Sequence, residues 1–262
     1  MISYLLPAYN EERSIADVLR AVTTVAFPGE EWRIVVVDDG SRDHTPQILD
    51  EWKKLAPVTV LAHETNQGLG AAMRTGLTHL GRIVSEDDAV VALDADNTQD
   101  PALAVRMRAK QKAEDLDIVI ASRYCRSSDA DKGEEIGLAF HRKVLSRGAS
   151  SIMAAAFRIK GATDYSCGFR LYSGRILKRA GEIYGDNLVE EKDFVCMVEI
   201  LVKLSHIGAK VGEVPLVLRY DLKSGPSKLK ITRTVLRYFR LIWAYKVLGR
   251  LRRYRYAPPA KP

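Results

Sequence analysis

The sequence is short of cysteine and has no long hydrophobic run. Its 262 residues include three cysteines, Cys125, Cys167 and Cys196, with no CxxC spacing, which favours a reducing compartment over a disulfide-bonded secreted protein. The best candidate for a membrane-spanning helix, residues 235–251, contains four lysines and arginines, so we expect no span. The first residues, MISYLLPAYNEE, break at Pro7 and turn acidic, which indicates a β-strand rather than a signal peptide. The sequence therefore predicts a cytoplasmic protein.

Other absences exclude classes of enzyme. The five histidines show no HExxH spacing, so a zinc hydrolase of that type is not supported. The first predicted strand ends in PAYNE, where a dinucleotide-binding fold has its glycines, and this argues against a nicotinamide or flavin enzyme. The Gly-rich, Arg-bearing first loop with which a nucleotidyltransferase would position a triphosphate is missing as well.

Acidic residues are absent from the C-terminal end. No aspartate or glutamate follows Asp221, whereas 12 lysines and arginines lie between Lys223 and Lys261. The first 221 residues carry 28 basic against 33 acidic side chains, a net charge of about −5, although the whole chain has a net charge of +7. Such an asymmetry indicates an anionic partner for the tail.

Short apolar runs alternate with amphipathic stretches of helical length in the first half of the chain. Strands rich in Val, Ile and Leu and separated by helices predict an α/β fold, with a Rossmann-like, mostly parallel sheet covered by helices on both faces. Residues 126–137 are polar without an apolar period, and we expect a mobile loop there. The predicted strands are 2–6, 34–37, 58–62, 89–93 and 118–121, and the predicted helices are 14–25, 45–55, 70–80 and 102–112.

Two aspartates follow the fourth predicted strand, with one small residue between them. In open α/β sheets, ligands bind beyond the carboxyl ends of the strands, and hard divalent cations prefer oxygen ligands. Asp94 and Asp96 therefore predict a site for Mg²⁺ or Mn²⁺ shared with the phosphates of a nucleotide. Helix capping before Pro101 is the structural alternative for the same residues.

A second acidic pair, Asp38 and Asp39, follows the second predicted strand. Carboxylates at this position can accept hydrogen bonds from a nucleoside, although turn formation alone would also explain the sequence Asp-Gly-Ser. The segment Asn66–Arg74 opens the third predicted helix, and its glycines would let backbone amides approach a ligand closely.

Taken together, PAYNEE, VVVDDGS, NQGLGAA, ALDADNTQDP and ASRY resemble the inverting glycosyltransferase family 2, and most closely its dolichol- or polyprenol-phosphate mannose synthase branch. HRKVLSRGAS, DYSCGFRLYS and EVPLVLRYDLKSGPSKLK extend the resemblance over nearly the whole chain. It implies a GT-A fold and transfer of a sugar, mannose or glucose, from a nucleotide-diphosphate donor to a polyprenyl or dolichyl phosphate. It further implies a GT-A domain at residues 1–222, with a nucleotide-sugar half at 1–122 and an acceptor half at 123–222.

The resemblance also assigns roles to individual donor-side residues. The Mg²⁺ or Mn²⁺ ligands would be Asp94, Asp96 and Gln99, with Asp96 also acting in catalysis. In the family the glutamine ligand stands one residue earlier, where this chain has Thr98, so Gln99 departs from the pattern. The nucleotide-binding residues would be Pro7, Tyr9, Glu11, Asp39, Asp94 and Ala95.

On the acceptor side, Arg123 and Arg142 would act in catalysis, and the acceptor would be bound by Arg142, Ser146, Arg219 and Lys223. An anionic lipid phosphate needs gathered positive charge and no general base. If the acceptor were instead a hydroxyl on a small or soluble molecule, an acid would have to remove its proton, and Asp193 would be the candidate. A charged first turn of the helix toward His206 is the structural alternative for Asp193.

The tail, residues 223–262, mixes cations with bulky apolar residues. Leu236, Phe239, Trp243 and Val247 fall near one helical stripe, which predicts a basic amphipathic helix on an anionic membrane surface. We therefore expect a peripheral protein on the cytoplasmic face of a membrane. A protein surface or self-association is the alternative, with a homo-oligomer or a membrane-protein partner. Nucleic-acid binding ranks last, and we expect none.

Overall fold

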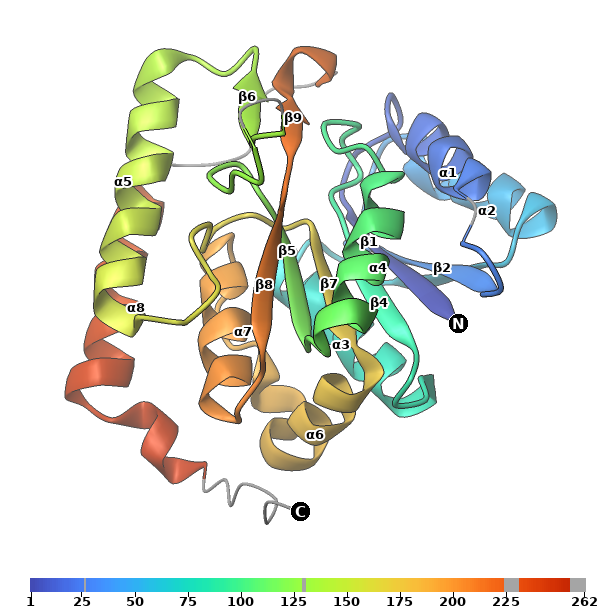
Figure 1. The fold of residues 1–262 in the computed structure, drawn as a ribbon. Helices are drawn as coiled ribbons and strands as arrows, with labels where there is room; N and C mark the ends of the chain where they lie inside the picture. Colours follow the sequence, from blue (N-terminus) through green and yellow to red (C-terminus); the bar gives the residue numbers. More distant parts are fainter. Residues whose placement is uncertain (26, 129–130, 224–230, 255–262) are drawn as a thin grey trace.

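The computed structural model describes residues 1–25, 27–128, 131–223 and 231–254, and its centre is a seven-stranded sheet with helices on both faces (Figure 1). Around the first five strands the elements are β1 (Ile2–Ala8), α1 (Ile15–Thr24), β2 (Trp32–Asp38), α2 (Thr45–Leu55), β3 (Val58–Ala62), α3 (Leu69–Ile83), β4 (Ala89–Ala92), α4 (Leu103–Glu114) and β5 (Ile118–Ser122). The predicted α/β alternation is confirmed over this half of the chain.

The second half continues with β6 (Glu134–Ile136), α5 (Phe140–Phe157), β7 (Arg170–Ser173), α6 (Gly174–Tyr184), η1 (Gly185–Leu188), α7 (Val195–His206), β8 (Val211–Pro215), β9 (Val217–Arg219) and η2 (Tyr220–Leu222). The chain then forms α8 (Ile231–Ile242), a short π-helical turn η3 (Trp243–Val247) and η4 (Arg250–Arg253). Among the described residues, no helix is long and apolar enough to cross a membrane.

The strands of the large sheet run in the order β3-β2-β1-β4-β7-β5-β8. All neighbours are parallel except β7, which is antiparallel to both β4 and β5. Because β1, β2, β4, β5 and β8 share one direction, their carboxyl ends lie at one edge of the sheet. This edge collects the loops that carry most of the candidate residues.

The expectation of an irregular loop at 126–137 is wrong for its last residues. Glu134–Ile136 form β6, which pairs in parallel with β9 in a second, two-stranded sheet. The pairing joins segments about eighty residues apart in the chain, so no local period of apolar residues reveals it. Glycine at 133 is needed because a Cβ there would lie 2.4 Å from the backbone of Ser122 and Arg123.

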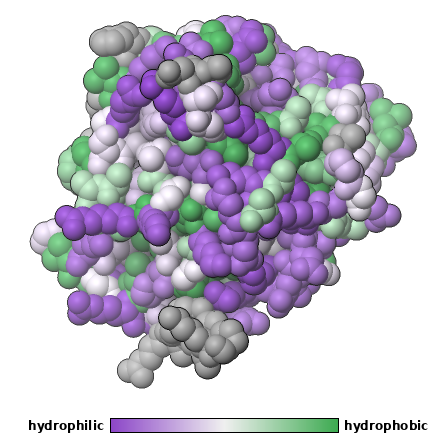
Figure 2. Space-filling model, in the orientation of Figure 1, coloured by the Kyte–Doolittle hydropathy of each residue, from purple (hydrophilic) through white to green (hydrophobic). Residues whose placement is uncertain are grey.

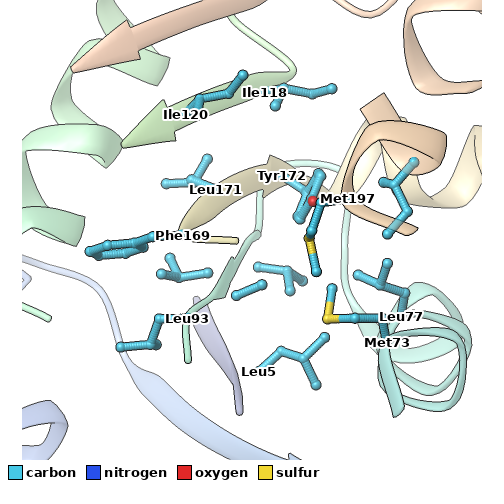
Figure 3. Packing of buried hydrophobic residues seen from close by; sticks show 14 of the residues in the cluster. Leu5, Met73, Leu77, Leu93, Ile118, Ile120, Phe169, Leu171, Tyr172 and Met197 are labelled. Atoms are coloured by element: carbon cyan, nitrogen blue, oxygen red, sulfur yellow. The ribbon is translucent and has the colours of Figure 1, made fainter. Parts of the chain in front are cut away.

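Successive residues of β1 point to opposite faces of the sheet, as its alternation requires. Leu5 packs on α3, where a Cβ on Gly76 would lie 2.2 Å from its side chain, whereas Tyr4 contacts Phe27 and the carbonyl of Pro101 on the other face. Figure 3 shows Leu5 facing Met73 and Leu77 of α3, with Met197 of α7 beside them. The core is therefore continuous between the sheet and the helices behind it.

The C-terminal helical segment packs onto this domain. Tyr238, Leu241 and Tyr245 are buried and belong to the main core, and α8 lies beside α5 (Figure 1). The Tyr245 hydroxyl donates to Glu199 on α7, and Arg250 pairs with Glu190. The domain boundary that we draw between residues 222 and 223 stays a prediction, and α8 lies against the fold that precedes it.

Candidate active site

Asp94 and Asp96 lie in the tight loop that follows β4, at the edge where the strands end. The Asp94 backbone N–H donates to Gln99 Oε1 at 3.0 Å, and Gln99 Nε2 donates back to Asp94 Oδ2 at 2.9 Å. Asp96 Oδ1 accepts from the hydroxyl of Thr98 at 2.6 Å. Both ends of the Gln99 amide are thus turned to Asp94, which they orient, and the role of Gln99 as a metal ligand stays a prediction.

Negative charge is concentrated in this loop. Burial, and then the charge of Asp96, raise the pKa of Asp94 to about 7, and Glu11 after β1 adds to the same effect. Gly168, at the start of β7, leaves room for Asp94, because a Cβ there would lie 3.2 Å from Asp94 Oδ1. Asp94 and Asp96 therefore concentrate negative charge where Asp94 is withdrawn from water, and Glu11 adds to it, which favours a bound cation.

One cation of the chain already faces this pair. The Lys223 ammonium contacts Asp96 Oδ2, and its charge opposes the rise in the pKa of Asp94. Arg219, four residues earlier, pairs instead with Asp221 at 2.7 Å in an exposed position. Lys223 and Arg219, which were predicted together on the acceptor side, therefore have different surroundings. Lys223 contacts the metal motif, and Arg219 is exposed and pairs with Asp221.

The donor set fits a hard divalent cation. Asp94 and Asp96 present carboxylate oxygens from residues two apart, and a Mg²⁺ or Mn²⁺ ion held by one or two carboxylates completes its shell with water and substrate phosphates. Among the described residues, no cluster of three or more His, Cys, Asp or Glu suits a metal. A cation at this loop would therefore depend on oxygens from outside the protein, such as those of a diphosphate.

The loop after β1 is held by the loop after β2. The Asn10 N–H donates to Ser41 Oγ at 2.9 Å, and the Glu11 N–H donates to Thr45 Oγ1 at 2.8 Å. Asn10 has a positive φ of 51°, a conformation that asparagine tolerates better than most residues. Pro7, at the end of β1, and Tyr9, in the loop that follows, are partly buried, and their contact with a nucleoside stays a prediction.

The carboxylates of the second acidic pair, Asp38 and Asp39, accept hydrogen bonds from the protein itself. Asp39 Oδ1 accepts from the Gln67 N–H at 3.0 Å and lies 2.6 Å from His63 Nδ1, and Oδ2 accepts from the Gly68 N–H at 2.8 Å. Asp38 Oδ1 accepts from the Ser41 N–H at 3.0 Å. The structure thus supports a turn-building role for both residues, and a nucleoside contact by Asp39 stays a prediction.

The glycines of the segment NQGLG serve close packing within the chain. The Gly70 N–H donates to the carbonyl of Lys192 at 2.8 Å, and a Cβ on Gly70 would lie 1.7 Å from the carbonyl of Glu191. Gly68 likewise leaves room for Lys192. The amides of Gly68 and Gly70 therefore bond to the protein, contrary to our interpretation that these glycines open the backbone to a ligand.

Arg123 lies in a network that the sequence does not reveal. Its guanidinium makes a two-point ion pair with Asp164, at 2.7 Å from Nε and from Nη2, and Nη2 also donates to Ser166 Oγ at 2.8 Å. Nη1 donates to Ser146 Oγ at 3.1 Å. Arg123 and Ser146, both predicted to act on the acceptor side, are thus in contact. Asp164 lies in the motif DYSCGFR, but the sequence alone assigns it no role.

A cavity of about 410 Å³ opens beside this network, between β6 and α5. Its lining is rich in cations. Arg147 lies over the ring of Tyr124 at 5.3 Å, and the Tyr124 hydroxyl donates to Ser146 at 3.0 Å. Arg142 lies on α5, but its side chain is outside the described part of the structure. The cavity is lined by Arg123, Tyr124, Cys125, Arg126, Lys132, Gly133, Glu134, Glu135, Lys143, Val144 and Arg147.

Asp193, the candidate base for a hydroxyl acceptor, precedes α7 and lies beside Gly68. Its Oδ2 is 2.5 Å from Arg237 Nη1 of α8. This carboxylate, which would have to accept the proton of a hydroxyl acceptor, is thus engaged by an arginine of the chain. The predicted charged first turn is displaced as well, because α7 begins at Val195.

The sequence profile of glycosyl transferase family 2 matches residues 3–181. The dolichyl-phosphate beta-glucosyltransferase ALG5A of Trichomonas vaginalis is 30% identical over 239 residues, which are 88% of this chain and 68% of that protein. The dolichol-phosphate mannosyltransferase of Pyrococcus furiosus is 29% identical over 92% of this chain and 62% of its own length. The chain thus spans about two thirds of the length of these relatives.

Solved structures share the fold at lower identity. Glucosyl-3-phosphoglycerate synthase from Mycobacterium tuberculosis, in complex with Mn²⁺, UDP-glucose and phosphoglyceric acid, has a TM-score of 0.64 at 18% identity, over 93% of this chain and 80% of that one. A mannosyltransferase from Pyrobaculum calidifontis, in complex with GDP-Man and Mn²⁺, has a TM-score of 0.56 at 18% identity, over 98% of this chain and 66% of that one.

Proposed function

Because this chain belongs to glycosyltransferase family 2 and has its GT-A fold, we propose that it transfers mannose or glucose from a nucleotide-diphosphate donor to a polyprenyl or dolichyl phosphate. The observation that carries the proposal is that an acidic group and a basic group follow two strands at the same edge of the sheet. Asp94 and Asp96 follow β4, and Arg123, which donates to Ser146 of α5, follows β5. The relatives named above as dolichyl-phosphate and dolichol-phosphate transferases support the lipid phosphate as acceptor.

The donor side of the reaction needs a charge that holds the leaving diphosphate. A Mg²⁺ or Mn²⁺ ion on Asp94 and Asp96, when bound, supplies charge to that diphosphate electrostatically. Gln99 keeps the Asp94 carboxylate oriented, because its Nε2 donates to Oδ2 while its Oε1 accepts from the Asp94 backbone N–H. Thr98 does the same for Asp96. The chain thus prepares both carboxylates before the donor binds.

The acceptor side needs an aligned anionic oxygen and no general base. Asp164 fixes the Arg123 guanidinium in one orientation, and Nη1 donates to Ser146 Oγ and to Glu135 Oε1, so a phosphate would bind Nη1 and the Ser146 hydroxyl by displacing Glu135. Displacement in line with the leaving group inverts the anomeric configuration in one step. Since Arg237 neutralises Asp193, the geometry favours the phosphate acceptor over a hydroxyl that must lose a proton.

The C-terminal segment offers a surface for a membrane. Its predicted stripe is exposed, with Leu236 71%, Phe239 54%, Trp243 58% and Val247 58% accessible. Arg240 and Lys246, in the same segment, are exposed too. Such a face can enter the interface of an anionic bilayer while its cations meet the headgroups. We therefore place the enzyme at the cytoplasmic face of a membrane, an assignment that its three free cysteines support.

A transfer assay tests the acceptor. We expect the protein, with Mn²⁺ and one of the mannose or glucose donors carrying GDP or UDP, to form a glycosylated polyprenyl phosphate with inverted anomeric configuration. Polyprenol of the same chain length is the matched control and should remain unmodified. Transfer to the polyprenol but not to its phosphate would contradict the proposal and favour a hydroxyl acceptor.

Vesicle binding tests the membrane surface. Burial of a phenylalanine side chain contributes about 1.5–3 kcal/mol, so Phe239→Ser should weaken binding to anionic vesicles by about tenfold or more. Leu55→Ser is the matched control, because Leu55 on α2 is 74% exposed and lies outside the C-terminal segment. Equal binding by the wild-type protein and Phe239→Ser would contradict the assignment of this face to the membrane.

A further inference from the structure

Lys223 occupies a position that its predicted acceptor role does not explain. Its ammonium contacts Asp96 Oδ2 and lies 5.4 Å from the centre of the Tyr220 ring. The Lys223 and Asp96 side chains are only 17% and 14% exposed. A lysine at a solvated surface pairs loosely with an acid, whereas this one is largely withdrawn from water and faces the metal motif.

The backbone around Lys223 is held against the same loop. The Arg219 N–H at the end of β9 donates to the carbonyl of Thr98 at 2.9 Å, and β9 pairs with β6. Gly137, just after β6, allows this approach, since a Cβ there would lie 2.7 Å from the Asp221 nitrogen. Residues 217–223 therefore form a strap across the Asp94–Thr98 loop, with Lys223 at its end.

The charges around Asp96 change when the donor binds. Without a metal ion, Lys223 is the cation that the structure places on Asp96, among residues 1–25, 27–128, 131–223 and 231–254. A divalent cation held by Asp94 and Asp96 would compete with Lys223 for that carboxylate and would be accompanied by the donor diphosphate. The ammonium has three donors and a flexible stem, with which it could reach a diphosphate bound at this loop.

We propose that Lys223 is a diphosphate-binding residue of the donor site, which neutralises Asp96 before the metal ion arrives and moves to the leaving diphosphate once the ion is bound. The inference rests on the proposed function for the identity of the donor. It differs from that function because it concerns binding steps that need no acceptor.

Binding measurements on three variants test the inference. Lys223→Ala removes the ammonium, Lys223→Arg keeps the charge, and Lys210→Ala is the control, because Lys210 forms an exposed ion pair with Asp115 just before β8. Mn²⁺ binding without nucleotide is measured from the electron paramagnetic resonance signal of the free ion. Binding of GDP or UDP, whichever the wild-type protein takes, is measured by calorimetry at saturating Mn²⁺.

We expect Lys223→Ala to bind Mn²⁺ more tightly than the wild-type protein in the absence of nucleotide, since the ammonium no longer competes for Asp96. The same variant should bind the nucleoside diphosphate about tenfold more weakly, which is the effect of one lost charge-assisted hydrogen bond. Lys223→Arg should retain nucleotide affinity to within about threefold, and Lys210→Ala should match the wild type in both assays.

Two results would overturn the inference. Unchanged nucleotide affinity in Lys223→Ala would mean that the ammonium never reaches the diphosphate. Weaker Mn²⁺ binding in Lys223→Ala and Lys223→Arg alike would mean that the lysine only supports the shape of the loop. Neither assay uses an acceptor, so an absence of transfer to every lipid phosphate would refute the proposed function and leave the assignment of Lys223 standing.

Discussion

Two acidic pairs follow two parallel strands of the same sheet, yet their surroundings differ. Asp39, beside Asp38 after β2, has both carboxylate oxygens engaged by N–H groups of residues 63–68. Asp94, after β4, faces Asp96 and Glu11, and burial together with these charges raises its pKa to about 7. The Asp38–Asp39 pair is satisfied by hydrogen-bond donors of the protein, whereas the Asp94–Asp96 pair is faced by Lys223, whose single charge does not balance two carboxylates.

The difference shows what a carboxylate pair after a strand can become. An acid that accepts several backbone hydrogen bonds stabilises a turn, and no further ligand is needed to hold it ionised. An acid pressed against other acids in a region of low polarity needs a cation. We therefore propose that Asp38 and Asp39 stabilise the loop after β2, and that Asp94 and Asp96 hold the cation.

The largest expected effect comes from removing charge at the Asp94–Asp96 pair. Asp94→Asn or Asp96→Asn should lower sugar transfer roughly 100- to 1000-fold or more, since the leaving diphosphate loses its counter-charge. The unfolding midpoint of Asp94→Asn should stay the same or rise, because a like charge is removed, whereas that of Asp96→Asn should fall, because Lys223 loses its partner. Initial-rate assays and thermal unfolding measure the two effects. Asp50→Asn, on the exposed face of α2, is the control, and a fall in its activity would show that the assay responds to charge at any site.

At the Asp38–Asp39 pair we expect the opposite pattern, a loss of stability. Asp39→Asn should lower the free energy of unfolding by about 1–3 kcal/mol, because the Gln67 and Gly68 amides lose an ionised acceptor. Thermal unfolding without nucleotide measures this. If the midpoint stays unchanged while nucleotide affinity falls, Asp39 is a ligand of the nucleoside and the contrast between the pairs breaks down.

The pH dependence sharpens the same contrast. In the folded state the pKa of Asp94 lies near 7, above its ordinary value of 3.8, so the folded protein keeps this proton to higher pH than the unfolded chain. Stability of the metal-free protein should therefore fall as pH rises from about 4 to 7, and this component should vanish in Asp94→Asn. Urea midpoints at pH 5 and pH 8 for both proteins measure it.

Metal binding should depend on pH with the opposite sign. Because the ligand must be ionised, Mn²⁺ affinity should rise by about tenfold between pH 6 and pH 8 and level off above the pKa of Asp94. An Mn²⁺ titration of the wild-type protein at four pH values checks this. An Mn²⁺ affinity that stays constant over this range would mean that Asp94 is already ionised at pH 6. The excess negative charge that we assign to the Asp94–Asp96 pair would then be absent.

Much of the fold follows from local patterns in the sequence. The predicted elements of the first half match β1–β5 and α1–α4 to within a few residues, because each is a continuous apolar run or an amphipathic period. β7 was not predicted as a separate antiparallel strand between β4 and β5. Neither was the pairing of β6 with β9, since both depend on contacts between distant segments.

The site divides in the same way. The Asp94–Asp96 motif is visible in sequence because its residues are adjacent. The partners of Arg123, Asp39 and Gly70 lie 41, 29 and 122 residues away, at Asp164, Gly68 and Lys192. Lys223 lies 127 residues from Asp96, and only the folded strap brings them together. The sequence thus identifies residues that could bind a ligand or take part in catalysis. The fold determines which of them are already engaged in contacts within the protein.

Mn²⁺ titration in the presence of nucleoside diphosphate tests the contrast most directly. Electron paramagnetic resonance would count bound Mn²⁺ in the wild-type protein, in Asp94→Asn and in Asp39→Asn, at a temperature where all three are folded. We expect one nucleotide-dependent Mn²⁺ in the wild type and in Asp39→Asn, and a loss of that site in Asp94→Asn. Retention of the ion in Asp94→Asn, or its loss in Asp39→Asn, would contradict the assignment of the cation to the Asp94–Asp96 loop.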